Sequence, residues 1–186
     1  TIRDGTFTNK TFQVGANNGE TINVASIANA QTAALGVSTR ASTNSAAIAG
    51  FATTAIASGD ITINGTNIGA IGTAANASDR ASQLVTAINA VAETTGVTAF
   101  VDTTSNTIQL NSGADIVIAG SAPTPFTAGT TAAAATTGIS SVDVLSAGTA
   151  SLALDTIDSA LDQINSARGT LGALQSRFEN AIGNIM

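Results

Sequence analysis

Residues 150–185 read ASLALDTIDSALDQINSARGTLGALQSRFENAIGNI and carry the longest periodic pattern in the chain. Apolar side chains recur at alternating spacings of three and four residues, which is the pattern of an amphipathic α-helix. We therefore predict one long helix, roughly 50 Å in length at about 1.5 Å per residue. Its side chains fall into three heptad columns: Leu154, Leu161, Arg168, Gln175 and Ile182; Ile157, Ile164, Leu171, Phe178 and Ile185; and Ala153, Ala160, Ala167, Leu174 and Ala181.

This apolar stripe is wider than the two-column seam of a simple coiled coil, which indicates contact with more than one neighbouring helix. The sequence indicates no second helix of matching length. Because an exposed stripe this long is an association site, we expect another chain, or a part of the same protein outside this sequence, to cover it. The residues that we assign to helix packing and assembly are Leu154, Ile157, Leu161, Ile164, Arg168, Leu171, Leu174, Gln175, Phe178 and Ile182.

Two polar residues, Arg168 and Gln175, interrupt one column of the stripe. A polar residue at such a position can set the register and the choice of partner between packed helices. The alternative is that the helix turns both side chains toward solvent. The sequence leaves the two interpretations open.

A compact β/α pattern lies in the middle of the chain. Residues 61–63 and 66–68 flank Asn64-Gly65, a dipeptide that favours the type I′ turn of a β-hairpin. A helix follows, capped by Asn76 or Ser78 and closed by Gly96. Its apolar face is predicted to comprise Ala77, Ala81, Leu84, Val85, Ile88, Val91 and Ala92, and the strands after it are predicted at 97–101, 107–110 and 115–119.

The flanking segments have weaker patterns. Residues 12–15 and 21–24 alternate apolar and polar side chains around a connection rich in Asn and Gly, which predicts a β-hairpin. Residues 128–138 are a low-complexity run of Gly, Thr and Ala, interpreted as a linker, and 139–145 are predicted to be extended. Residues 25–58 support no assignment.

Three stretches of the chain resemble bacterial flagellin. Residues 157–165 (IDSALDQIN) and 171–182 (LGALQSRFENAI) are similar to the C-terminal core helix of that family. Residues 12–22 (FQVGANNGETI) resemble the hairpin that flagellins carry after their N-terminal core helices. Residues 59–100 resemble the insertion motif that flagellins share with hook-associated proteins.

The resemblance implies an α+β fold, in which a long C-terminal core helix with a β-hairpin carries an inserted small α/β outer domain. We expect residues 1–38 and 139–186 to form the core domain and 39–138 to form the outer domain. In the family, long helices precede the hairpin and a helical tail follows the core helix, so we expect this chain to be a subunit that lacks its terminal helices.

The same resemblance implies a structural subunit of the extracellular flagellar filament, which polymerises through helical core segments, serves motility and is exported without a cleaved signal peptide. The implied partners are other flagellin subunits, an export chaperone, the filament cap and an innate immune receptor of animal hosts.

Composition excludes several classes of function. The chain has no His and no Cys. This composition excludes imidazole bases, thiolate nucleophiles, disulfides and zinc fingers. Its formal net charge of −6, with six scattered basic residues, argues against nucleic acid and anionic membranes as partners. We expect no enzymatic activity and no cofactor.

Carboxylates remain the chemically active groups. Asp155, Asp158 and Asp162 recur along one side of the predicted helix and form either a metal-binding ridge or a solvated acidic face. A second set of carboxylates lies at predicted turns and comprises Asp60, Asp102 and Asp115. These residues could bind Ca²⁺, or they could only stabilise their turns by hydrogen bonds. The alternative functions are a surface-exposed carbohydrate-binding or adhesin module, which the scarcity of aromatic residues disfavours, and a glycosidase that uses only carboxylates.

Overall fold

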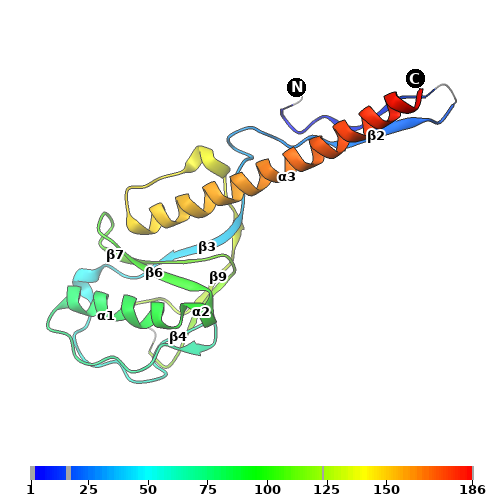
Figure 1. Cartoon of the computed structure of the whole chain (residues 1–186). Helices are drawn as coiled ribbons and strands as arrows, with labels where there is room; N and C mark the ends of the chain where they lie inside the picture. Colours follow the sequence, from blue (N-terminus) through cyan, green and yellow to red (C-terminus); the bar gives the residue numbers. More distant parts are fainter. Residues whose placement is uncertain (1–2, 16–17, 123, 186) are drawn as a thin grey trace. The chain divides into compact units, whose positions relative to one another are not determined.

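The computed structural model describes residues 3–15, 18–122 and 124–185, without the side chains of 184 and 185 (Figure 1). Small antiparallel sheets combine with a long C-terminal helix, so the predicted α+β class is confirmed. The chain divides into two compact units. The terminal unit comprises Thr1–Val37, Thr137–Ser141 and Asp155–Met186, and the middle unit comprises Ser38–Thr136 and Val142–Leu154.

The terminal unit contains a hairpin and the greater part of the long helix α3 (Ala147–Ile185). Strands β1 (Thr8–Gln13) and β2 (Thr21–Ser26) pair in antiparallel fashion, with Phe12 opposite Ile22. The predicted hairpin is therefore confirmed, although residues 16 and 17 of its connection lie outside the described residues. The hairpin lies beside α3 (Figure 1). The Phe12 ring meets the Phe178 ring edge to face, with centroids 5.9 Å apart.

The middle unit is built on two four-stranded sheets. In one, the order is β10 (Ala134–Ala135), β3 (Thr39–Asn44), β7 (Thr107–Ser112) and β6 (Val97–Asp102). In the other, it is β5 (Thr66–Asn67), β4 (Thr62–Ile63), β8 (Ile116–Ala119) and β9 (Gly129–Thr131). The core between these elements is almost wholly aliphatic, and its fully buried members include Ile61, Ile63, Leu84, Ile88, Val97, Ile108, Leu110 and Ile116.

Helix α1 (Ala77–Ala90) begins at the predicted position but ends at Ala90, so the single helix predicted to reach Gly96 is two helices. The Asn76 side chain accepts a hydrogen bond from the Asp79 N–H (2.9 Å), which satisfies one of the unpaired donors at the helix N-terminus. The short helix α2 (Ala92–Thr95) follows and ends at Gly96, which has a left-handed φ of 69°. The predicted turn is also confirmed, because Asn64 and Gly65 both have positive φ values, 48° and 78°.

A buried arginine ties α1 to the loop before β4. Arg80 is 1% exposed, and its guanidinium donates hydrogen bonds only to backbone carbonyls. They belong to Ala52 (3.1 Å), Thr53 (3.1 Å), Thr54 and Gly72 (2.9 Å). The carbonyl dipoles replace part of the water that a buried cation loses, since Nη1 has no hydrogen-bond partner within the described residues. The sequence analysis did not anticipate this role.

One asparagine closes the outer edge of strand β6. The Asn89 side chain, on α1, donates to the Ala99 carbonyl (3.0 Å) and accepts from the Ala99 N–H (2.8 Å). It thereby satisfies both backbone groups that Ala99 turns away from β7. Unpaired edge groups invite another strand to pair with them, so Asn89 removes one such opportunity.

Two predictions about the connecting segments were wrong. Residues 128–138 are more than a linker, because β9 pairs with β8 and β10 pairs with β3. Residues 139–145 were predicted to be extended, but the 3₁₀-helix η2 (Gly138–Ser141) occupies the first three of them. The helix forms here because Gly138, at φ 64°, lets the chain pass against the Thr32, Ala33 and Leu35 carbonyls.

Residues 25–58, which the sequence left unassigned, contain β3 and the 3₁₀-helix η1 (Ile48–Gly50). β3 is the inner neighbour of β7 in the first sheet. Its sequence, TRASTN, has only one fully buried residue, Ala41. A strand this polar lacks the apolar alternation by which strands are detected.

Candidate assembly interface

The large side chains of the predicted stripe lie at the surface of α3. The aliphatic members that are exposed retain between 41% and 65% of their accessible area, and they are Leu154, Ile157, Leu161, Ile164, Leu171 and Ile182. Isolated exposed apolar residues are ordinary on protein surfaces, but a row at helical spacing indicates a binding face. α3 therefore presents an apolar face along its length.

The small side chains of α3 turn the other way. Ala153 and Ala160 are buried, and the remaining members of that column, Ala167, Leu174 and Ala181, are half-buried. Thr156 is also buried. The helix therefore packs against its own chain through a narrow row of alanines, while most of the larger apolar residues stay accessible.

Two residues of the predicted interface, Leu174 and Phe178, are half-buried rather than exposed. Phe178 makes the contact with Phe12 in the terminal unit. Arg168 and Gln175 are exposed, and Gln175 Nε2 donates a hydrogen bond to Glu179 Oε1 (2.8 Å). The side chain of Ile185 lies outside the described residues.

A polar side chain that the sequence analysis did not single out fixes α3 within the terminal unit. Gln163 Oε1 accepts a hydrogen bond from the Gly36 N–H (3.1 Å), and Gln163 Nε2 donates to the Val37 carbonyl (3.3 Å). Both partners are backbone groups more than a hundred residues away in sequence. Periodicity alone cannot reveal such a contact.

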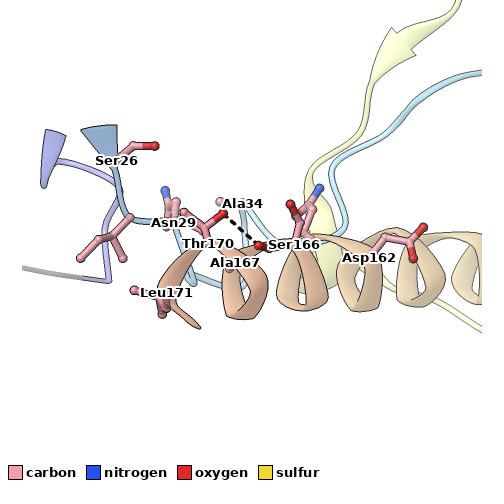
Figure 2. Close-up of a pocket in the computed structure, with 11 residues that line it drawn as sticks. Ser26, Asn29, Ala34, Asp162, Ser166, Ala167, Thr170 and Leu171 are labelled. Atoms are coloured by element: carbon pink, nitrogen blue, oxygen red, sulfur yellow. Dashed lines mark hydrogen bonds between the residues drawn. The ribbon is translucent and has the colours of Figure 1, made fainter. Parts of the chain in front are cut away.

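A groove of about 610 Å³ runs beside α3 in the terminal unit (Figure 2). One wall comes from the segment after β2, and the other from α3 between Asp162 and Leu171. Figure 2 shows the Thr170 hydroxyl turned back toward the helix, where it donates to the Ser166 carbonyl (3.0 Å). Leu171 belongs both to this groove and to the exposed stripe, so the two surfaces are continuous.

Of the acidic residues considered as metal ligands, Asp60 and Asp102 accept hydrogen bonds within their own turns, and Asp115 bonds a distant backbone group. Asp60 accepts from the Ala57 N–H (2.9 Å), and Asp115 accepts from the Ala133 N–H (2.8 Å). The Ser105 hydroxyl and the Thr104 N–H donate to Asp102 and hold its pKa below the ordinary value. Asp155, Asp158 and Asp162 are exposed on α3. Within the described ranges, no three His, Cys, Asp or Glu side chains are grouped to hold a metal ion.

Comparison with known families gives two matches on separate parts of the chain. Residues 60–114 match the flagellin hook IN motif, and residues 154–186 match the bacterial flagellin C-terminal helical region. The two matches place the chain among the flagellins. No curated protein sequence matches the chain.

The C-terminal match of this flagellin covers every residue assigned to the stripe, from Leu154 to Ile182. The hook motif match covers β4 to β7, with both α-helices of that segment. A flagellin is a structural subunit of the extracellular flagellar filament, and it assembles with other flagellin subunits. In the part of this flagellin that the structure describes, no helix is both long enough and apolar enough to cross a membrane.

Proposed function

We propose that this flagellin polymerises through the exposed face of α3 and that the resulting filament serves motility. The observation that carries the proposal is the orientation of α3, which buries alanines and leaves leucines and isoleucines accessible. A helix that had completed its packing would bury its largest apolar side chains first. The accessible row is therefore best explained as the half of an interface that another helical core segment of flagellin completes.

The energetics favour such a contact. Full burial of a Leu or Ile side chain is worth about 1.5–3 kcal/mol, and six of them are accessible on α3. Association costs several kcal/mol in lost translational and rotational freedom. Because the six side chains retain between 41% and 65% of their area, burying the whole row offsets much of that cost, whereas burying one or two residues does not. Assembly should therefore engage the face over several helical turns.

The proposal assigns different roles to the two ends and the middle of the chain. Residues 1–38 and 139–186 form the core that polymerises, and 39–138 form an outer domain inserted into it. The clustering of the hairpin with α3 supports this division. Residues Val142–Leu154, however, cluster with the middle unit.

The remaining parts of the proposal rest on the flagellin family alone. They are export without a cleaved signal peptide, and binding to an export chaperone, to the filament cap and to an innate immune receptor. The role is structural, without catalysis.

The substitution Ile164→Asp tests the assembly face. It places a charge in the middle of the row, where burial would remove its hydration. We expect self-association of the chain to weaken at least about tenfold, equivalent to about 1.4 kcal/mol. Analytical ultracentrifugation measures this change, and circular dichroism checks that the helix persists.

The matched control is Asn165→Asp, which adds the same charge at an exposed neighbouring position outside the row. Cells that carry either substitution in the subunit's own gene extend the test to filaments. Ile164→Asp should abolish filaments and swimming, while Asn165→Asp should leave both unchanged. Normal swimming by the Ile164→Asp cells would refute the proposed face.

A further inference from the structure

The chain contains two Asn-Gly pairs, Asn18-Gly19 and Asn64-Gly65, in very different surroundings. Such pairs are chemically labile, because glycine has no side chain to hinder attack by its backbone nitrogen on the preceding amide. Whether the attack occurs depends on the freedom of the asparagine side chain. The two pairs therefore offer an internal comparison between a free and a restrained asparagine.

Asn64 is held at every polar atom that the reaction would have to move. Its Nδ2 donates to the Thr95 carbonyl, and its Oδ1 accepts from the Val117 N–H, both at 2.8 Å. Its own N–H donates to the Val117 carbonyl, also at 2.8 Å. Bending the Asn64 side chain back toward the Gly65 nitrogen would break both side-chain bonds.

Asn18 has none of these restraints. It is exposed in the connection between β1 and β2, and no described residue forms a hydrogen bond with its side chain. Gly19, at φ 94°, has no neighbouring atom within 4 Å of the position that a side chain would occupy. The backbone there lies outside the β1–β2 ladder, which begins at the pair Gln13–Thr21.

We propose that Asn18 is a site of spontaneous deamidation in the folded chain and that Asn64 is protected. The Gly19 backbone nitrogen loses its proton and attacks Asn18 Cγ, forming a C–N bond. The Cγ–Nδ2 bond breaks, and Nδ2 leaves as ammonia with the proton, which closes a succinimide ring. Water then opens the ring at either carbonyl and yields aspartate or isoaspartate at position 18.

The product changes the tip of the hairpin in two ways. It adds one negative charge beside Glu20 to a chain whose formal charge is already −6, and the isoaspartate form adds one carbon to the backbone. Both changes fall in the connection, outside the paired residues of β1 and β2. The modified chain can therefore keep its hairpin, so the product accumulates without unfolding.

Prolonged incubation of the whole chain in mildly alkaline buffer, followed by peptide mapping, tests the proposal. We expect the mass gain of about one dalton, and isoaspartate detected by enzymatic methylation, in the peptide that contains Asn18, at a rate many-fold above that of Asn64. Gly19→Ala should slow the reaction at Asn18 and leave Asn64 unchanged.

A parallel incubation in urea separates structure from local sequence. Once the chain is unfolded, Asn64 loses its hydrogen bonds and should react at a rate close to that of Asn18. Equal rates at the two sites in the folded chain would overturn the proposal. So would protection of Asn64 that persists in urea, since the protection would then not come from the fold.

Discussion

Arg80 carries a positive charge into the interior of the middle unit, where carbonyl oxygens of the loop before β4 surround it. Its side chain joins helix α1 to the loop before β4 and to Gly72, which lies between β5 and α1. Because this residue is bonded to backbone groups, its role depends on geometry rather than on pairing with an acidic side chain. A shorter or uncharged residue cannot reproduce the fork of donors that the guanidinium supplies.

We expect Arg80→Met to lower the free energy of unfolding of the middle unit by about 3 kcal/mol, because the hydrogen bonds that its charged guanidinium makes are worth about 1.5–3 kcal/mol each. Urea unfolding followed by circular dichroism measures the change. Arg177→Met is the matched control at an exposed position and should shift the free energy by less than about 0.5 kcal/mol. Equal effects of the two substitutions would show that the buried hydrogen bonds do not stabilise the unit.

Asp102 provides a prediction about pH. The Ser105 hydroxyl, which donates to Asp102 Oδ2 (2.7 Å), is the main cause of the lowered pKa of this carboxyl, and the Thr104 N–H adds to it. A lowered pKa means that the folded state favours the ionised form. The resulting stabilisation is present above the ordinary pKa of 3.8 and is lost as the pH falls through the lower, folded value.

Ser105→Ala should therefore raise the Asp102 pKa toward its ordinary value, as measured by NMR titration of the carboxyl carbon. Ser82→Ala, which removes an exposed hydroxyl from α1, is the control and should leave the Asp102 titration unchanged. An unchanged pKa in the Ser105→Ala chain would mean that the hydroxyl does not stabilise the carboxylate.

Among the elements, helix α3 combines two kinds of surface. Its first two turns dock in the middle unit, where Arg40 Nη1 donates to the Leu152 carbonyl (2.9 Å) and Asn111 Nδ2 donates to the Gly148 carbonyl (3.4 Å). Its later turns, in the terminal unit, expose Gly169 and Gly172. Gly148 therefore lies at a packed position of α3, whereas Gly169 and Gly172 lie at open positions.

These glycines allow a paired test of packing against propensity. Gly169→Ala should stabilise the chain by about 0.5–1 kcal/mol, because alanine loses less conformational freedom in a helix and open space surrounds this position. Gly148→Ala should bring no such gain, because its Cβ would collide with the amide of Gln109. Thermal unfolding measures both variants, and equal stabilisation by the two would refute the close packing at Gly148.

For the whole molecule, the division into a polymerising core and an outer domain predicts where a protease first cuts. The chain crosses between the two compact units near residues 37, 136, 141 and 154. Of these places, the one near 136 follows β9 and β10, which are short strands with mostly exposed residues. Limited digestion with a broad-specificity protease should cut first within 36–42 or 121–138, because exposed connecting segments open most readily. Mass spectrometry identifies the cuts, and first cuts within 61–110 would contradict the division.

The features that could be read from the sequence are those created by neighbours along the chain. The periodicity of 150–185, the Asn64-Gly65 turn and the Asn76 cap all depend on interactions over a few residues. Hydrogen bonds within a helix or turn form between groups that are close in sequence, so a short stretch of sequence is enough to predict them. The apolar stripe was identified for the same reason.

The features that required the folded chain depend on partners far apart in sequence. Periodicity could not tell which columns of α3 turn inward, because alanines and leucines are both apolar; the partner surfaces decide that the alanines are buried. The pairing of β9 and β10 and the contacts of Arg80 and Gln163 likewise join distant segments. Such contacts arise because packed surfaces must fit one another and because buried polar groups must be paired. A short stretch of sequence predicts neither of these.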